Sequence, residues 1–169
     1  MSERSFEIAP MSPLIRGLTI FLLLLPVVFV AIGALGGGPA GVVLLATGAL
    51  IALLYASIWW GGRPSRFLVT DAALTIVWPV RRAVVPRHDV AGARVMTLRE
   101  FRDEYGNTVR VGAGGLFGTF GWLWSRRGGW LDVYVTNLGD WVVVERRSGR
   151  PLVLSPADPE GFAAALASP

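Results

Sequence analysis

The sequence predicts an α+β membrane protein, in which an N-terminal pair of transmembrane helices precedes a mainly antiparallel β domain and a short C-terminal helix. Three observations predict this fold class. Two long uncharged apolar runs follow one another near the N-terminus. Short β-rich runs separated by turn residues fill most of the remaining chain, and the last residues have helical spacing. We therefore expect a tail at residues 1–13, a helical hairpin at 14–60 and a β domain at 61–169.

The two apolar runs are long enough to cross a bilayer. Residues 17–35 contain 19 positions without a charge, and residues 39–60 contain 22 more. At about 1.5 Å per residue, each run covers the roughly 30 Å of bilayer hydrocarbon. Residues 36–41, GGGPAG, predict a tight turn between them. The small residues that allow close helix packing are Gly41, Thr47, Gly48, Ala56 and Ser57. The alternatives are a buried hairpin of a soluble protein and a signal peptide, whose apolar region is usually shorter.

The placement of arginines predicts the orientation of this hairpin. Arg4 and Arg16 precede the first run, Arg63 and Arg66 follow the second, and the turn between the runs has no charge. Basic residues flanking transmembrane helices stay on the cytoplasmic side, so we expect both ends of the chain there. The tail before the hairpin is short, polar and rich in proline, and we expect it to be poorly ordered.

The β domain is predicted from eight short runs, which indicate about seven strands. The clearest is 131–136, in which Leu131, Val133 and Val135 alternate with polar or aromatic residues. Residues 155–158, SPAD, resemble a capping box with proline at the first helical position, and they predict a closing helix of about 10 residues. The runs lie at 66–70, 73–79, 83–86, 93–98, 108–111, 131–136, 141–147 and 150–155.

Four segments in this order resemble the bacterial pleckstrin-homology (PH-like) domain family, here with an N-terminal two-helix membrane anchor. They are FLVTDAALTI at 67–76, VVPRHDVAGARV at 84–95, GGLFGTFGWLW at 114–124, and the closing hairpins and helix at 133–166. The resemblance implies a strongly bent antiparallel sheet or small β-barrel, closed at one end by the C-terminal helix. The sequence departs from the family in its short closing helix, and it lacks the basic pattern with which many eukaryotic PH domains bind phosphoinositides.

The resemblance itself implies little about a ligand, because this fold hosts unrelated functions. We expect a membrane-anchored binding or scaffold protein at the cytoplasmic face of the bacterial inner membrane, acting through lipid, self-association or protein contacts. The alternative is an accessory or sensor subunit of a membrane protein complex. The expected partners are the membrane, anionic lipid headgroups, and a second copy or another membrane protein. The formal net charge of +4 is too small to indicate a nucleic-acid binder.

Candidate catalytic residues are few, and we expect no enzyme activity, cofactor or metal. The chain has one histidine, His88, and no cysteine, which excludes cysteine-based metal sites. We expect His88 to lie on the surface of a turn. The acidic cluster at 99–107, REFRDEYGN, alternates with arginines and predicts a solvated hairpin or loop rather than an acid–base or cation site.

Two sets of residues are candidates for contact surfaces. We expect a long loop at 112–129, because no strand pattern covers it and glycines allow sharp turns. Its aromatic side chains either cap the sheet as core or enter the lipid headgroup region, and both interpretations stay open. The loop contains Phe117, Phe120, Trp122 and Trp124, and Trp130 directly after it completes the set of candidate aromatic residues. The candidate membrane-surface arginines are Arg63, Arg66, Arg81, Arg82, Arg126 and Arg127.

Overall fold

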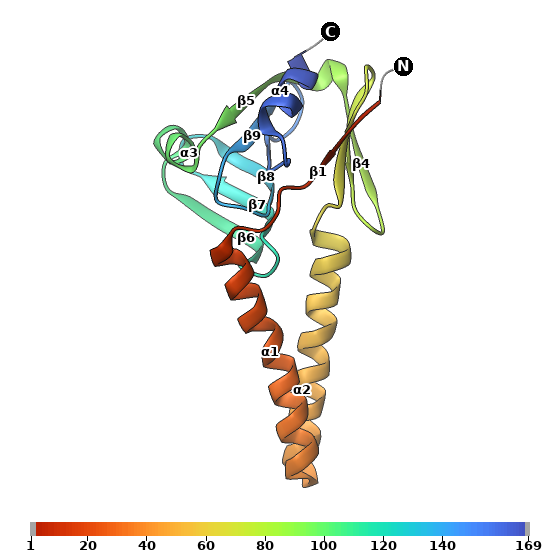
Figure 1. The fold of residues 1–169 in the computed structure, drawn as a ribbon. Helices are drawn as coiled ribbons and strands as arrows, with labels where there is room; N and C mark the ends of the chain where they lie inside the picture. Colours follow the sequence, from red (N-terminus) through yellow and green to blue (C-terminus); the bar gives the residue numbers. More distant parts are fainter. Residues whose placement is uncertain (1–2, 168–169) are drawn as a thin grey trace.

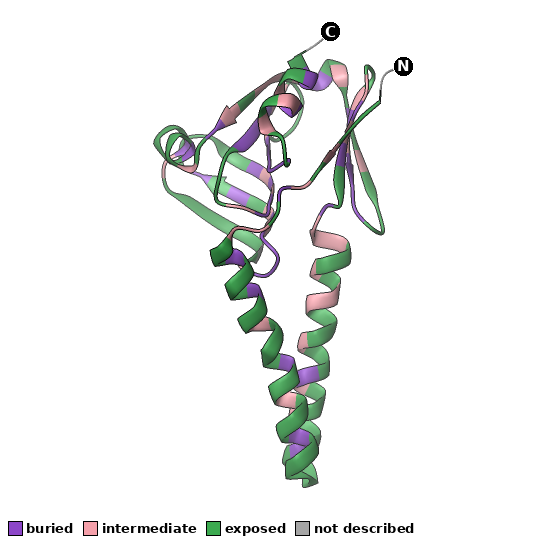
Figure 2. Ribbon diagram, viewed as in Figure 1, coloured by how far each residue is buried: buried purple, intermediate pink, exposed green. Residues whose placement is uncertain are grey.

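The computed structural model describes residues 3–167 and shows two long helices that carry a β-rich domain at their open end (Figure 1). The helices are α1 (Pro13–Gly36) and α2 (Gly38–Ser57), and a π-helical turn, η1 (Ile58–Gly62), continues α2. Both are long and apolar enough to cross a membrane, and little of either is buried, as Figure 2 shows. A core helix of a soluble protein would be mostly buried, so the pair is consistent with an anchor. We call this pair the apolar hairpin.

Glycines hold the two helices together near their turn. A Cβ atom on Gly41 would lie 2.6 Å from the Gly33 carbonyl oxygen, and one on Gly48 would lie 2.8 Å from a methyl group of Val30. Only hydrogen fits at such distances, so the backbones approach closely, as the sequence predicted for Gly41 and Gly48. Towards the domain the helices diverge, and the hairpin has the shape of a V (Figure 1).

The domain consists of two sheets, and the predicted small barrel is wrong because the sheets do not close. A four-stranded antiparallel sheet has the order β1-β2-β3-β4, and a six-stranded mixed sheet has the order β5-β9-β10-β8-β7-β6. Among the strands of residues 3–167, the pairing of β10 with β8 is the one parallel pair. The first sheet contains β1 (Arg4–Glu7), β2 (Arg66–Val69), β3 (Ala73–Val77) and β4 (Arg82–Pro86). The second contains β5 (Val90–Met96), β6 (Thr108–Gly114), β7 (Thr119–Ser125), β8 (Gly129–Val135), β9 (Trp141–Arg146) and β10 (Leu152–Leu154).

The main core lies between the two sheets, where helix α4 (Pro159–Ala167) closes it. Phe162 of α4 is fully buried, and its ring lies 5.2 Å from that of Phe6 and 5.6 Å from that of Phe67. The closing helix is confirmed, but its cap is Asp158, which accepts a 2.9 Å hydrogen bond from the Gly161 backbone N–H. Ser155 is buried instead and accepts a bond from the Thr136 N–H.

The N-terminal tail is ordered, contrary to the prediction. Its strand β1 pairs with β2, and the next residues cross to the C-terminal segment. The Ala9 N–H donates to the Ser155 carbonyl at 2.8 Å, and the Thr136 hydroxyl donates to the Ala9 carbonyl. The free edge of β2 and these buried acceptors order residues 4–9, a segment with two large apolar side chains, Phe6 and Ile8. The tail thereby joins the two sheets.

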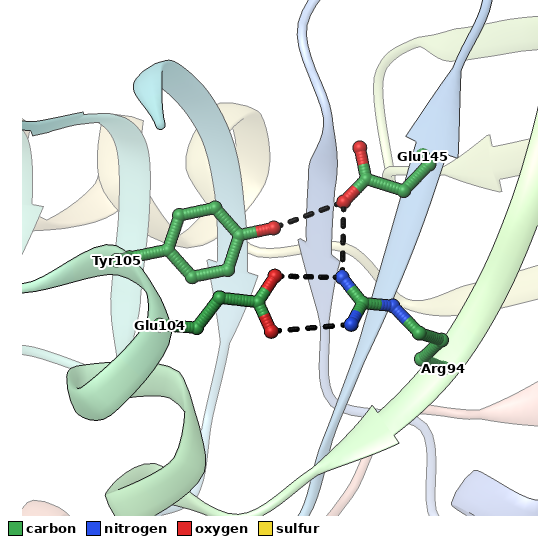
Figure 3. A network of polar contacts seen from close by, with 4 residues as sticks. All are labelled: Arg94, Glu104, Tyr105 and Glu145. Atoms are coloured by element: carbon green, nitrogen blue, oxygen red, sulfur yellow. Dashed lines mark hydrogen bonds and ion pairs between the residues drawn. The ribbon is translucent and has the colours of Figure 1, made fainter. Parts of the chain in front are cut away.

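The acidic cluster forms a helix, α3 (Leu98–Tyr105), where the sequence predicted a hairpin or loop. The Thr97 hydroxyl and the Glu100 carboxylate cap its first turn reciprocally. Figure 3 shows how its last turn is fixed: Arg94 of β5 makes a two-pronged ion pair with Glu104, and the Tyr105 hydroxyl donates to Glu145 of β9 at 2.9 Å. Arg94 holds the pKa of Glu104 below its usual value, and burial raises that of Tyr105.

Asp89 of the turn η2 (Arg87–Asp89) supplies a pH-dependent contribution to stability. Its buried carboxylate accepts bonds from the Ser148 N–H and hydroxyl, both at 2.6 Å, and from Arg146 at 2.8 Å, which lower its pKa to about 2. Because the folded-state pKa lies below the unfolded value, this stabilisation is complete above about pH 4 and is lost as the pH falls towards 2.

We therefore predict that Asp89→Asn lowers the melting temperature at neutral pH. The difference from the wild type should shrink as the pH falls from about 4 to about 2, because the wild-type carboxylate becomes protonated over that range. Thermal unfolding followed by circular dichroism across this range measures the effect, with Asp140→Asn in the exposed β8–β9 turn as the control. A difference that stays constant with pH would contradict the assignment.

Candidate functional site at the helix–sheet junction

The turn between β6 and β7 lies between the diverging ends of α1 and α2 (Figure 1). We call residues 115–118 of this turn the wedge. Leu116 and Phe117 are 4% and 7% exposed, and with Phe120 they form a cluster of their own. This cluster packs against the side chains at the open end of the hairpin, so the sheet contacts both helices at once. Those side chains are Met11, Leu22, Tyr55 and Ile58.

A buried threonine of α1 fixes the backbone of the wedge. Thr19 is 3% exposed, and its hydroxyl oxygen accepts a 2.9 Å hydrogen bond from the Phe117 N–H. Phe117 has a φ of 60°, a left-handed conformation that costs a non-glycine residue on the order of 1 kcal/mol. Gly115 meets α1 so closely that a Cβ atom there would lie 2.8 Å from Leu18. The hydrogen bond and the close fit hold the strained turn in place.

A second set of contacts ties the four-stranded sheet to the end of α2. The Trp78 indole N–H, at the start of the β3–β4 turn, donates to the Gly62 carbonyl at 2.9 Å. Trp59 packs edge-to-face on Phe117 with ring centres 4.7 Å apart, and the Arg63 guanidinium lies 4.7 Å from the Trp59 ring centre. Burial lowers the pKa of Arg63. Both sheets are therefore attached to the hairpin, one through the wedge and one through Trp78.

The structure divides the six predicted arginines into two groups. Arg66, Arg81 and Arg82 line one cavity of about 540 Å³, and Arg63 lies nearby at the end of α2. Arg126 and Arg127 instead form the β7–β8 turn beside α3, where Arg127 donates to the Asp103 carbonyl at 2.6 Å. This separation could not be predicted from the local sequence pattern, because it depends on where β7 ends.

The predicted long loop is wrong, because β6 and β7 form a regular hairpin through it. Their register pairs Thr108 with Ser125 and Gly114 with Thr119. Phe120, Trp122 and Trp124 occupy alternate positions and so share one face of β7. The end of α2 covers Phe120, which is 2% exposed, whereas the two tryptophans lie beyond that cover. The phenylalanines are therefore core and the tryptophans are exposed, and entry of the tryptophans into the headgroup region stays a prediction.

The exposed tryptophans belong to a continuous apolar surface, which we call the aromatic face. Trp124 of β7 lies between Val109 of β6 and Trp130 of β8, and Trp122 lies beside Val111. The exposed fractions are 50% for Trp122, 40% for Trp124 and 44% for Trp130. The face consists of Val109, Val111, Trp122, Trp124 and Trp130.

One charged pair lies beside the aromatic face. The Arg150 guanidinium is 5.6 Å from the Trp122 ring centre and 5.9 Å from that of Trp130, and it forms a 3.6 Å ion pair with Asp132 of β8. Burial raises the pKa of Asp132 although Arg150 opposes this shift. The surface therefore combines apolar rings with one basic and one acidic group.

The structure places the residues that the sequence offered as candidates for catalysis or metal binding. His88 is exposed on η2, and its neighbour Asp89 bonds to Arg146 and Ser148. Glu100 and Glu104 are engaged in the cap and the ion pair of α3. Within residues 3–167, no three histidine, cysteine, aspartate or glutamate side chains gather as a metal site. The arrangement presents contact surfaces.

Sequence reasoning did not select Thr19 and Trp78, the two side chains that tie the domain to the hairpin. Thr19 is the one polar side chain in residues 17–35, which is a usable signal because an isolated hydroxyl in an apolar helix needs a partner. Nothing in the sequence marks Trp78 in this way, because its hydrogen-bond partner is the backbone carbonyl of Gly62, which the fold brings close to it.

Thr19→Val tests the wedge directly. Valine keeps the shape but removes the hydroxyl, which leaves the buried Phe117 N–H without its partner. We predict a loss of about 1–2 kcal/mol in the free energy of unfolding, measured on the full chain in micelles. Thr47→Val is the matched control, because its hydroxyl bonds only to Val43 of its own helix. Equal stability of the two variants would contradict the role of Thr19.

The comparisons with known proteins agree with the architecture of the β domain. No curated protein sequence and no solved structure matches the chain. A family model described as Bacterial PH domain matches residues 65–169, which is more than half of the sequence. The match begins just after η1 and covers β2 to α4, whereas β1 and the apolar hairpin lie outside it. The chain therefore belongs to the bacterial PH domain family.

Proposed function

We propose that this protein is a scaffold of the bacterial inner membrane, which holds its PH-like domain at the cytoplasmic face and self-associates through the aromatic face. The observation that carries the proposal is the group of three exposed tryptophans and two exposed valines on a sheet attached to the apolar hairpin. Contiguous apolar surface of this kind is typical of interaction sites.

The membrane position is supported by the hairpin and its flanks. Trp59 and Trp60 are 40% and 55% exposed at the end of α2, where indole rings favour the lipid–water boundary. Because β1 pairs with β2, the N-terminal residues and the domain share the open end of the hairpin. The flanking arginines, Arg16 and Arg63, belong to that end as well and favour the cytoplasmic side.

The orientation of the aromatic face favours a second copy of the chain, rather than the bilayer surface, as its partner. Strand β6 is nearest the hairpin and β5 is farthest from it, so the faces of the six-stranded sheet point sideways, along the membrane plane (Figure 1). A twofold axis along the membrane normal brings this face of one copy against the same face of another. Arg150 and Asp132 would then meet groups of opposite charge across the axis.

The size of the aromatic face predicts weak association. Its exposed rings and methyl groups offer on the order of 400 Å² per copy, whereas a stable soluble dimer buries about 800 Å² per partner. Confinement of both copies to one membrane raises their effective concentration and favours pairing. We therefore expect a reversible dimer rather than a permanent one.

The wedge favours a second candidate function, that of an accessory or sensor subunit. It contacts both helices at the point where they diverge, so a partner that changed the helix spacing would displace the wedge and the β6–β7 hairpin with it. Crosslinking in native membranes distinguishes the two functions: copies of the chain joined to each other support the scaffold, and one stable foreign partner supports the subunit.

Trp122→Ser combined with Trp124→Ser tests self-association in the full chain. We predict that the fraction of crosslinked dimer in membranes falls several-fold while the melting temperature barely changes, because both rings are exposed. Val109→Ser with Val111→Ser should act in the same direction. Val84→Ser with Leu138→Ser is the matched control, since these side chains are 63% and 41% exposed away from the aromatic face. An unchanged dimer fraction in both test variants would overturn the proposal.

Reporter fusions at residues 1 and 169 test the orientation separately. We predict that both reporters are active in the cytoplasm, because the uncharged turn at the far end of the hairpin crosses the membrane more readily than its arginine-flanked end. A periplasmic signal from residue 169 would place the domain on the opposite side and rule out the proposed location.

A further inference from the structure

We propose that the cavity beside the end of α2 binds the phosphate group of an anionic phospholipid. The cavity has a volume of about 540 Å³ and lies on the four-stranded sheet, and its Arg81 also lines a second cavity that reaches Trp122 of the aromatic face. Three arginines and one serine supply its polar lining, with Trp78, Pro79 and Val80 beside them. The four polar residues are Ser65, Arg66, Arg81 and Arg82.

Short backbone connections fix this cavity at the end of the hairpin. The Ser65 N–H donates to the Val77 carbonyl at 2.7 Å, and the Trp78 N–H donates to the Arg81 carbonyl at 2.8 Å, which closes the β3–β4 turn. The Trp78 indole then joins this turn to Gly62, the last residue of η1. The arginines therefore lie directly beside the end of the apolar helix, which is the level of the lipid phosphates.

The charges of the cavity fit an anion. Arg66 and Arg82 both lie opposite Val77 in the strand register, so the two arginines share one face of the sheet. Arg81 lies 4.2 Å from the Trp78 ring centre and interacts with the Tyr134 hydroxyl. None of the ion pairs among residues 3–167 uses these arginines. Glu7 is the cross-strand neighbour of Arg66, which leaves three cations against one carboxylate.

A phosphate matches the chemistry of this lining. Guanidinium groups present parallel N–H donors that pair two at a time with phosphate oxygens, and the Ser65 hydroxyl adds a neutral donor. Val80, at the tip of the turn, is 69% exposed and lines the cavity with Pro79. These apolar side chains next to the arginines suit the glycerol and acyl parts of a lipid, which a free phosphate ion lacks.

The assignment of the bound phosphate to a membrane lipid rests on the membrane anchoring proposed above, which the reporter fusions test independently. The full chain in a neutral detergent is titrated with phosphatidylglycerol and followed by native mass spectrometry. Phosphatidylcholine is the comparison lipid, and inorganic phosphate is the soluble competitor. We expect one saturable phosphatidylglycerol per chain. Its affinity should fall about tenfold in Arg66→Gln with Arg82→Gln, because two charge-assisted contacts are lost.

Arg126→Gln with Arg147→Gln is the matched control, since it removes the same charge from two exposed positions away from the cavity. It should change the affinity less than twofold, by the same electrostatic argument. An equal loss in both variants would show diffuse attraction and overturn the site. Displacement by inorganic phosphate at concentrations similar to the lipid would assign the cavity to a soluble phosphate instead. If the double variant does not fold, Arg82→Gln alone gives the same comparison with Arg126→Gln.

Discussion

The contact between Thr19 and the wedge is the constraint on which the rest of the structure depends. A hydroxyl in α1 holds Phe117 in a left-handed conformation, and this places Leu116 and Phe117 between the diverging helices. Without that contact the six-stranded sheet would be joined to the hairpin mainly through chain connections. With it, the direction of β7 is set relative to α1, and so is the direction of the aromatic face.

The N-terminal tail and Trp78 complete this attachment from the other side. The tail adds β1 to the four-stranded sheet and reaches the buried Thr136 and Ser155 of the second sheet, so the chain entering α1 is anchored in the core. Trp78 joins the chain leaving α2 to the β3–β4 turn. The family match covers neither the tail nor the helices. This attachment is therefore a feature of the whole chain, and it brings the arginine-lined cavity to the helix end.

Much of the fold follows from local patterns, and the errors have identifiable causes. The apolar runs, the close packing at Gly41 and Gly48 and the alternation of Leu131, Val133 and Val135 predicted their elements correctly. Strand β1 was missed because its hydrogen bonds come from β2, about 60 residues away in the chain. Strand β7 was missed because glycines obscure the alternation of its aromatic residues. Helix α3 has too few residues for its apolar side chains to show a helical repeat, although its capping box, Thr97 and Glu100, is visible in the sequence.

The measurement that tests the role of the wedge most directly is the distance between the hairpin and the six-stranded sheet. The chain has no cysteine, so spin labels can be placed at Leu50 of α2 and Arg110 of β6, which are both exposed and lie outside the aromatic face. Pulsed electron paramagnetic resonance on the full chain in lipid bilayers should give one narrow distance distribution, and Thr19→Val should broaden it. A broad distribution in the otherwise unmodified chain, unaffected by Thr19→Val, would show that the domain is only tethered and would contradict the role of the wedge.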